Sequence, residues 1–497
     1  MVKHIKKQLS DVPITMTCQL LLFFVGTIIL LRLSSLLAYM LFPLVVYTMM
    51  QKRTEFSFFV LMLLVSLAIT NSIFFEKSFH FYMASRVCLF ILATAMTFKA
   101  GFKKGVWFLS PFYLLIIFIF YMMAVSLAGW CPIVSELKAV LFLVFFLALM
   151  QGTGVVAQTG VDIRHIRAGM LAISIFYILG SLAVIPFPGI GRSMIYAKFS
   201  ESAESLAIIN EMSGLFNGVT WHSQCLGPTV ALLNAFLLSD YLCNFQKRSR
   251  LYMGLLAAVP LLVFLTSSRT AFFAYLISIF STVFFFMNER RAKASKKSRV
   301  LMNLVLCGFL AGVYLIVSPR GFTRLEGFLR KVQETEDMDR QKSFAEDISS
   351  SRMEAIERGM VNFRASPLIG NGFQVSEEMS EISLGGSGML LSAPIEKGVL
   401  PVMILEEGGV FGAFFFMAFL VALYSKYRKL QFTCFMSTFT VFIALNSGEA
   451  IFFSTSGGGG ILWMTCFSAL LMDIHRQRRI LTEAVPQTAF LLGRYQA

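Results

Sequence analysis

The sequence predicts an all-α protein that crosses a membrane many times. Of its 497 residues, 57% are hydrophobic and only 14% are charged, whereas soluble globular proteins carry roughly 25% charged residues. Apolar runs of about twenty residues recur, each long enough to cross ~30 Å of hydrocarbon as a helix. These runs are apolar on every side, unlike the alternating strands of about ten residues in transmembrane barrels. We therefore expect a polytopic helical membrane protein.

The apolar windows predict about fourteen transmembrane helices. In chain order they cover residues 16–31, 34–50, 56–74, 80–98, 106–128, 139–157, 168–187, 225–243, 251–267, 270–288, 299–318, 401–424, 432–447 and 456–472. Only Arg32 and Leu33 separate the first two windows, and Gly457 to Gly460 interrupt the last one. Either feature could mark a re-entrant hairpin, so the expected range is 12 to 14 helices.

The distribution of basic residues predicts the topology. The chain carries 43 Lys and Arg against 28 Asp and Glu, a formal charge of +15. With the N-terminus inside, most of the Lys and Arg residues outside the spans fall on the cytoplasmic side, where such residues concentrate. The short external loops carry only Arg32, Lys77, Lys138, Arg192, Lys198 and Arg269. We expect both termini in the cytoplasm, and because topology accounts for the charge, no nucleic-acid partner.

The spans divide the chain into four parts. Residues 1–318 hold the first eleven helices, 319–400 form a large external loop, 401–474 hold the last three helices, and 475–497 form a cytoplasmic tail. A loop of about eighty residues far exceeds the usual connection and is expected to be a folded lid or binding element. The eight cysteines show no CxxC or Cys/His spacing, so we expect no metal, disulfide framework or cofactor.

The external loop contains the signals of an amphipathic helix. Ser351 followed by Glu354 is a capping box, and the helix is expected to stop ahead of Pro367. Its apolar face consists of Met353, Ile356, Met360 and Phe363.

Two arginines are candidates for binding an anion. Arg269 lies in the polar pentapeptide Thr266 to Thr270, between two closely spaced spans. It can snorkel to lipid headgroups or bind a phosphate with two hydrogen bonds. Arg86 lies one to two turns inside the fourth span, where snorkelling, a structural ion pair and ligand binding are all open.

A histidine and a group of loop residues are further candidates. His222, beside Trp221 at the mouth of the eighth span, is either a packed interfacial residue or a base. The glycine-rich turn Ser366 to Phe373 contains Asn371, a candidate for substrate binding. The charged residues that follow and lead into the twelfth span include Glu396, Lys397 and Glu407. A single carboxylate in a charged loop is usually solvated, but Glu407 heads an apolar span.

Three patches in this order resemble the O-antigen ligase and polymerase superfamily of bacterial envelope proteins. The first is the Ser268-Arg269 pair, and the second is the Arg-led helix from Arg352 to Gly372, which ends in Pro-Leu-Ile-Gly-Asn-Gly. The third is the Glu-x-Gly-x-x-Gly entry formed by Glu407, Gly409 and Gly412. The mouth of the eighth span, Trp221 to Pro228, is a looser match. The resemblance covers roughly residues 210 to 425.

The resemblance implies a metal-independent glycosyltransferase of the bacterial cytoplasmic membrane that acts outside on sugars carried by undecaprenyl diphosphate. Such a reaction needs cations to hold the departing diphosphate and a base for the acceptor hydroxyl. By resemblance, Arg269 takes the diphosphate role and Arg352 assists. The implied partners are the undecaprenyl-diphosphate-linked oligosaccharide, membrane lipid and polysaccharide-assembly proteins.

One departure from the family pattern bears on the reaction. Ligases of this family carry a His-Asn pair about nine residues before the Glu-x-Gly motif, where this sequence has Gly398-Val399. The hypothesis is therefore a polysaccharide polymerase with Glu396, Glu407 or His222 as the base. Lys397 binds the diphosphate or pairs with Glu396. The alternatives are an O-antigen ligase and a lipid-linked oligosaccharide flippase, although we see no internal repeat of the kind found in transporters.

Overall fold

The computed structural model describes eleven segments of the chain. They are residues 13–33, 110–159, 163–186, 216–220, 223–244, 250–266, 268–291, 356–375, 399–448, 450–454 and 457–484. The long helices in these segments are α2 (Ile14–Leu33), α6 (Tyr113–Ser126), α7 (Pro132–Thr159), α8 (Ile163–Val184), α11 (Ser223–Asn244), α12 (Arg250–Leu265), α13 (Arg269–Arg291), α17 (Leu400–Lys429), α18 (Thr433–Leu445) and α19 (Gly457–Ala484). These segments contain no β-sheet, which agrees with the predicted all-α class.

Each of these helices falls on a predicted apolar window. The windows at 34–50, 56–74, 80–98 and 299–318 lie outside the described residues, as does most of the predicted loop 319–400. Five described helices are long and apolar enough to cross a membrane: Pro132–Ala157, Ile163–Val184, Cys225–Cys243, Arg269–Glu289 and Leu400–Lys429. Their lengths satisfy the requirement of about 20 residues per span.

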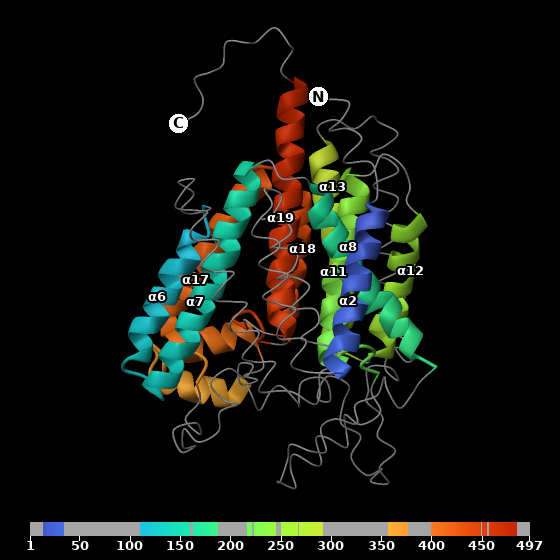
Figure 1. The fold of residues 1–497 in the computed structure, drawn as a ribbon. Coiled ribbons are helices and arrows are strands. Elements are labelled where there is room, and N and C mark those ends of the chain that lie inside the picture. The colour runs from blue at the N-terminus through green and yellow to red at the C-terminus, as the bar shows by residue number, and fades with distance from the viewer. Residues whose placement is uncertain are drawn as a thin grey trace, which may run out of the picture.

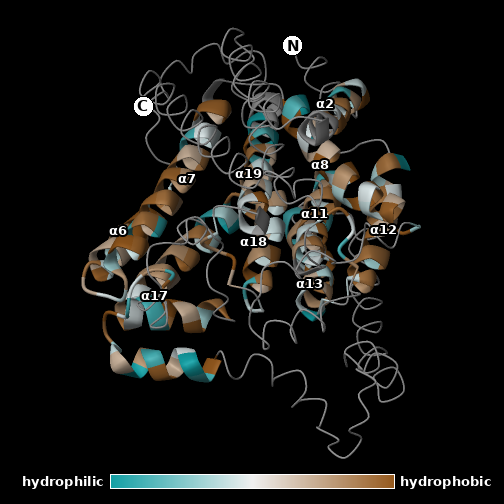
Figure 2. Cartoon of the chain, turned by 60° about the horizontal axis from the view of Figure 1, so that its bottom comes forward, coloured by the Kyte–Doolittle hydropathy of each residue, from teal (hydrophilic) through white to brown (hydrophobic). Residues whose placement is uncertain are grey.

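The helices form two groups with a central pair between them (Figure 1). Helices α6, α7 and α17 pack together on one side, and α2, α8, α11, α12 and α13 lie on the other. Between them, α18 and α19 contact both groups. The outer helices are strongly apolar in Figure 2, and large apolar side chains such as Phe120, Phe280 and Phe414 are exposed on them. Exposed apolar faces of this kind are expected to contact lipid tails.

Aromatic rings fill the space between the two groups. Trp463 of α19 is fully buried, and its ring lies 4.8 Å from that of Phe452, 5.0 Å from Phe442 and 5.4 Å from Phe146. Its indole N–H donates to the carbonyl of Phe452 at 2.6 Å. Because lipid tails are as apolar as these side chains, the rings stabilise the bundle by close packing rather than by leaving water.

Small polar residues join α11, α13 and α18. Asn234 Nδ2 donates to Ser278 Oγ at 2.6 Å, and Thr282 hydrogen-bonds both Ser239 and Ser437. Small and hydroxyl-bearing residues let membrane helices approach closely and hydrogen-bond across the interface. This contact places the start of α13, where Arg269 lies, beside the end of α18.

Two arginines that lie outside the predicted apolar windows, Arg167 and Arg476, are buried in ion pairs. The α7 and α8 helices begin at residues 132 and 163, earlier than the windows at 139 and 168, because the windows exclude charged residues. Arg167 is therefore inside α8, where Nε and Nη2 each lie 3.0 Å from the carboxylate oxygens of Asp240. Tyr252 donates to the same carboxylate at 2.7 Å. This ion pair joins α8, α11 and α12.

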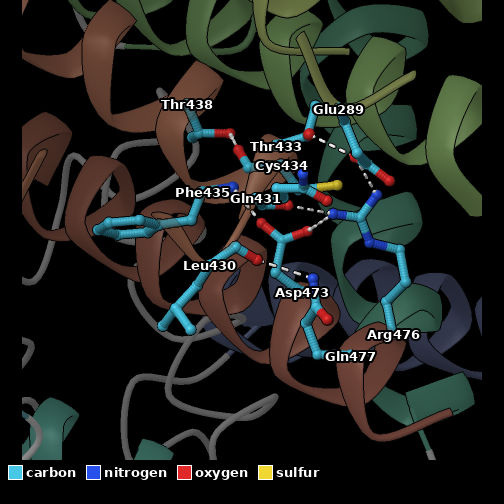
Figure 3. A network of polar contacts seen from close by, with 10 residues as sticks. All are labelled: Glu289, Leu430, Gln431, Thr433, Cys434, Phe435, Thr438, Asp473, Arg476 and Gln477. Atoms are coloured by element: carbon cyan, nitrogen blue, oxygen red, sulfur yellow. Dashed lines mark hydrogen bonds and ion pairs between the residues drawn. The ribbon is translucent and has the colours of Figure 1, made fainter. Parts of the chain in front are cut away.

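Arg476 is the second buried arginine, in the network of Figure 3. Its Nη1 lies 2.6 Å from Glu289 at the end of α13, and its Nη2 lies 3.1 Å from Asp473. Nη2 also donates to the carbonyl of Gln431 in the turn between α17 and α18. Glu289 lies 20 residues after Arg269, and helical rise places the two about 30 Å apart. The network therefore joins three helices at the end of the bundle opposite Arg269.

Candidate functional site

The candidate site is built around a break in α17 at Gly409. This residue has φ 62° and ψ −163°, far from helical values. Glycine adopts a positive φ readily because it has no Cβ. A Cβ at Gly409 would lie 2.4 Å from the backbone carbon and oxygen of Leu368, so no other residue fits. The break displaces the helical hydrogen bonds that would run from residues 410, 411 and 412 back to 406, 407 and 408.

The displaced amides after the break find partners in the Ser366 to Phe373 turn. The amide of Val410 donates to the carbonyl of Pro367 at 2.9 Å, and that of Phe411 to Leu368 at 3.2 Å. Two backbone amides at the start of the second half of α17 are thereby satisfied. The carbonyls of Pro367 and Leu368, in the second family patch, therefore accept hydrogen bonds from the third patch, the Glu-x-Gly-x-x-Gly segment of α17.

The displaced carbonyls before the break bind the next residues of the same turn. The amide of Asn371 donates to the carbonyl of Glu406 at 3.0 Å, and that of Gly372 to Glu407 at 3.1 Å. Gly370 makes this approach possible because a Cβ there would lie 2.3 Å from the backbone of Glu407. The turn therefore supplies partners for two carbonyls before the break and two amides after it, which a continuous helix would join in two hydrogen bonds.

Tyr121 of α6 is the partner of a further displaced backbone group. Its hydroxyl donates to the carbonyl of Gly408 at 2.8 Å and lies 3.3 Å from the carbonyl of Ile369 in the turn. In a continuous helix the carbonyl of Gly408 would accept from the amide of Gly412, so the phenol takes the place of this helical partner. The turn and Tyr121 thus partner five of the six displaced groups, as buried backbone polar groups require.

The hairpin of α6 and α7 holds the end of the turn. Ser126 accepts from the amide of Phe373 at 3.1 Å, and Ser135 donates to its carbonyl at 2.9 Å. Lys138 donates to the carbonyl of Gln374 at 2.9 Å. Lys138 was counted as an external loop charge, but it is buried inside α7 and bound to the backbone. Gln374 has φ 52°, in the left-handed region that residues with a side chain rarely adopt. The surrounding contacts stabilise this conformation.

Two buried carboxylates stand at the break. Glu406 and Glu407 are only 3% and 1% exposed. Glu406 Oε1 accepts from Asn362 Nδ2 at 3.0 Å. Asn371 donates its side-chain amide to the backbone carbonyls of Asn362 and Glu406, so this predicted substrate-binding residue also holds the turn together.

The helix before the turn covers the first half of α17. It is described from residue 356 to 365 and stops ahead of Pro367, as its sequence predicts. Figure 1 shows it in light orange, transverse to the bundle and across the lower end of α6 and α17. Gly359 is buried against Val402 and Glu406, where a Cβ would lie 2.6 Å from Val402. Charged residues Glu357 and Arg364 are exposed, so the helix is amphipathic.

Arg269 opens α13 at the same end of the bundle. Ser268 caps the helix, because its side-chain oxygen accepts from the amide of Ala271 at 3.3 Å. Gly227 of α11 packs against this first turn of α13, where an added Cβ would lie 2.6 Å from the Cβ of Ala271. The Ser-Arg patch and the mouth of the eighth predicted span therefore meet. Arg269 itself is half-buried.

The chain between α18 and α19, described at residues 446–448 and 450–454, connects these features. Gly448 packs on Thr270, where a Cβ would lie 2.3 Å from Thr270 Oγ1. The amide of Leu400 donates to the carbonyl of Asn446 at 3.0 Å, and Gln374 Nε2 donates to that of Phe453 at 3.0 Å. One segment thus contacts the Ser-Arg patch, the start of α17 and the end of the glycine-rich turn.

Asn446 is a candidate that sequence reasoning missed. Its Nδ2 donates to the carbonyl of Phe442 at 2.8 Å, and its Oδ1 is buried without a donor among the described residues. The polar run Asn446-Ser-Gly between two apolar windows was the available signal.

The structure brings three of the predicted site residues into one connected region. Asn371 and Glu407 belong to the broken-helix junction, and Arg269 is joined to it through residues 446 to 454. The other predicted site residues lie outside the described residues: Arg86, His222, Arg352, Glu396 and Lys397.

Comparison with known proteins confirms the resemblance seen in the sequence. Residues 252–417 match the model of the O-antigen ligase family. The match begins in α12 and ends in the second half of α17, so it includes Arg269, the glycine-rich turn and the break. No match was found among curated proteins. The apolar helices together with this family match indicate an integral membrane protein.

Proposed function

We propose that this chain, which carries the O-antigen ligase family match at residues 252–417, is a polysaccharide polymerase of the bacterial cytoplasmic membrane. It joins oligosaccharide repeat units carried on undecaprenyl diphosphate into surface polysaccharide. The observation that supports this most is the junction at the break of α17. There the family's Glu-x-Gly-x-x-Gly and Pro-Leu-Ile-Gly-Asn-Gly segments bind one another, beside the buried carboxylate of Glu407.

The proposed chemistry is transfer of a glycan from diphosphate to a sugar hydroxyl. The acceptor oxygen attacks the anomeric carbon, the bond from that carbon to the diphosphate oxygen breaks, and the hydroxyl proton passes to a base. Arg269 binds the diphosphate, with a guanidinium suited to two parallel hydrogen bonds. Its place in the first turn of α13 adds the positive end of the helix dipole. No metal or cofactor takes part in this proposal.

Glu407 is the base candidate among the described residues. It lies next to the break, where α17 is held rigidly by its backbone partners. Glu396 and His222 are the other candidates for this role, and Arg352, Arg86 and Lys397 are proposed to assist in binding the diphosphate. A rigid carboxylate is favoured as a base because proton transfer requires hydrogen-bond reach to the acceptor hydroxyl.

The residue before α17 favours a polymerase over a ligase. Ligases of this family have a His-Asn pair where this chain has Gly398-Val399. Val399 is the N-cap of α17, with extended φ −115° and ψ 129° and no side-chain cap. Gly398, at the histidine position, has no side chain, and Val399 cannot move a proton, so the histidine mechanism of a ligase has no residue here.

The test is deletion of the gene in its host, with separation of lipid-linked glycans and surface polysaccharide by size. Single repeat units that accumulate on the external leaflet, without long polymer, support a polymerase. Long polymer held on undecaprenyl diphosphate identifies a ligase, and repeat units confined to the cytoplasmic leaflet identify a flippase.

Complementation with Arg269→Ala tests the diphosphate role in the same strain. Loss of one preorganised cation is expected to lower the rate by about 10²- to 10³-fold, leaving little long polymer. Arg250→Ala is the matched control, because Arg250 is an exposed arginine at the opposite end of α12. Full polymer with Arg269→Ala, at wild-type protein level, contradicts the role of this arginine.

A further inference from the structure

We propose that Tyr121 of α6 is a positioning residue that keeps α17 broken at Gly409 and so holds Glu407 in place. Tyr121 lies outside the family match at 252–417, and neither its residue type nor its sequence context indicates a function. The inference rests on the proposed function for its activity readout, whereas its structural readout is independent of that function.

The phenol fits a space that Gly412 leaves open. A Cβ at Gly412 would lie 3.3 Å from Tyr121 Cε1, closer than ordinary van der Waals contact. The ring also packs on Phe415, with centroids 5.3 Å apart. In the Glu-x-Gly-x-x-Gly patch, Gly409 therefore permits the break, and Gly412 permits the approach of the tyrosine that bridges it.

The hydroxyl selects between two arrangements of α17. In the broken arrangement it donates to the carbonyl of Gly408 at 2.8 Å and lies 3.3 Å from the carbonyl of Ile369 in the turn. Without the hydroxyl, the carbonyl of Gly408 finds a partner in the amide of Gly412 only if the helix closes. Closure recaptures the carbonyls of Glu406 and Glu407, so the glycine-rich turn loses both partners of its amides. An unpartnered buried group is costly, so the closed arrangement becomes competitive when the hydroxyl is removed.

The position of the Glu407 carboxylate depends on whether α17 is broken or continuous. In a continuous helix, the side chains of residues 406 and 407 take directions set by the axis of the second half of α17. In the broken helix their directions follow the first half, which Asn362 and Asn371 hold against the turn. Tyr121 therefore acts on the reaction through Glu407 and is not itself required to touch substrate.

Hydrogen exchange on the full-length protein in lipid nanodiscs tests the structural claim. Tyr121→Phe is expected to speed exchange about tenfold, the effect of losing one buried hydrogen bond. The acceleration is confined to peptides that contain the amides of Asn371, Gly372, Val410 and Phe411. Tyr113→Phe, at an exposed tyrosine on the same helix, is the control and leaves these peptides unchanged.

A second variant covers the case in which Tyr121→Phe does not fold. Gly412→Ala keeps the hydroxyl but moves the ring, because the new methyl group lies 3.3 Å from Tyr121 Cε1. It is expected to accelerate the same peptides. Unchanged exchange in both variants overturns the proposal, and acceleration spread evenly over α11, α13 and α19 also overturns it, because it indicates general destabilisation.

Activity is then measured as repeat-unit transfer by the same nanodisc samples. Tyr121→Phe is expected to lower kcat at least tenfold with little change in KM, and combination with Gly412→Ala adds no further loss, because both changes act on the same contact of the tyrosine with the break. Multiplied effects in the double variant overturn the proposal. If wild-type protein transfers no repeat unit, the proposed function fails, while the exchange result still decides the role of Tyr121 in the fold.

Discussion

At the scale of single residues, the two adjacent glutamates of α17 differ in their surroundings. Glu406 Oε1 accepts a hydrogen bond from Asn362, while Glu407 is proposed as the base. Both are buried, so exposure does not distinguish them. Neighbouring side chains leave a helix axis about 100° apart, so the two glutamates give a matched pair of substitutions.

We predict that Glu407→Gln loses long polymer, with a fall in rate of about 10²- to 10⁴-fold, the usual contribution of a general base. Glu406→Gln keeps an oxygen for Asn362 and is expected to retain most activity. The measurement is polymer length in the complemented deletion strain at equal protein level. If Glu407→Gln and Glu396→Gln both leave full polymer length, the carboxylate hypothesis is wrong.

A second residue-scale prediction concerns the buried pair of Arg167 and Asp240. Both side chains are fully buried, so Asp240→Asn leaves an uncompensated charge and is expected to cost about 3–5 kcal/mol. The midpoint of thermal unfolding in detergent should fall by several degrees. The double variant Arg167→Met, Asp240→Leu removes both charges and should recover most of the loss. A double variant less stable than Asp240→Asn would contradict the claim that the uncompensated charge causes the loss of stability.

At the scale of elements, the junction of the glycine-rich turn with α17 is the feature on which the site depends. Apart from those of the Asn371 side chain and the phenol of Tyr121, the hydrogen bonds between the turn and the break join backbone atoms, so substitutions of the other side chains in the turn should be milder than changes at the glycines. Gly409 and Gly370 have positive φ and lie against the opposite backbone.

We predict that Gly409→Ala abolishes activity and destabilises the junction. The positive φ alone costs about 1–2 kcal/mol for a residue with a Cβ, and contact with Leu368 at 2.4 Å forces the backbones apart. Gly254→Ala is the control, because this α12 glycine has nothing within 4 Å of its added Cβ. The control should be neutral or slightly stabilising. Equal activity of the two variants in the transfer assay would contradict the role of the break.

At the scale of the whole molecule, the bundle has two different ends. One end holds the glycine-rich turn, the start of α13 and residues 446 to 454, which are joined by the contacts described above. The other holds the ion pairs of Arg476 and Arg167, which join helix ends without involving the candidate site. A lipid-linked substrate on one leaflet needs a reactive end and a stable opposite end.

The predicted topology places the reactive end outside the cell. In a chain without its native cysteines, Leu368→Cys should react with a membrane-impermeant thiol reagent on intact spheroplasts. Leu430→Cys, at the far end of α17, should react only after permeabilisation. Both positions are exposed. The reverse labelling pattern would invert the topology and place the glycine-rich turn in the cytoplasm.

The sequence by itself determined the helices, because crossing hydrocarbon needs a local run of apolar residues whose length can be read directly. It also showed the three family patches, since each is a short run of adjacent residues. It did not show that the second and third patches bind one another. Those hydrogen bonds join backbone groups about forty residues apart, and backbone groups carry no sequence signature.

Only the tertiary structure decided which residues outside the patches matter. Tyr121 is 287 residues from Gly408, and Arg167 is 73 from Asp240. The apolar windows left Lys138, Arg167 and Arg476 outside the predicted spans, because a hydropathy window cannot see the partners that allow a charge to be buried. The physical reason is the same in each case: the apolar environment requires every buried polar group to be paired, but the pairing is chosen by how the helices pack.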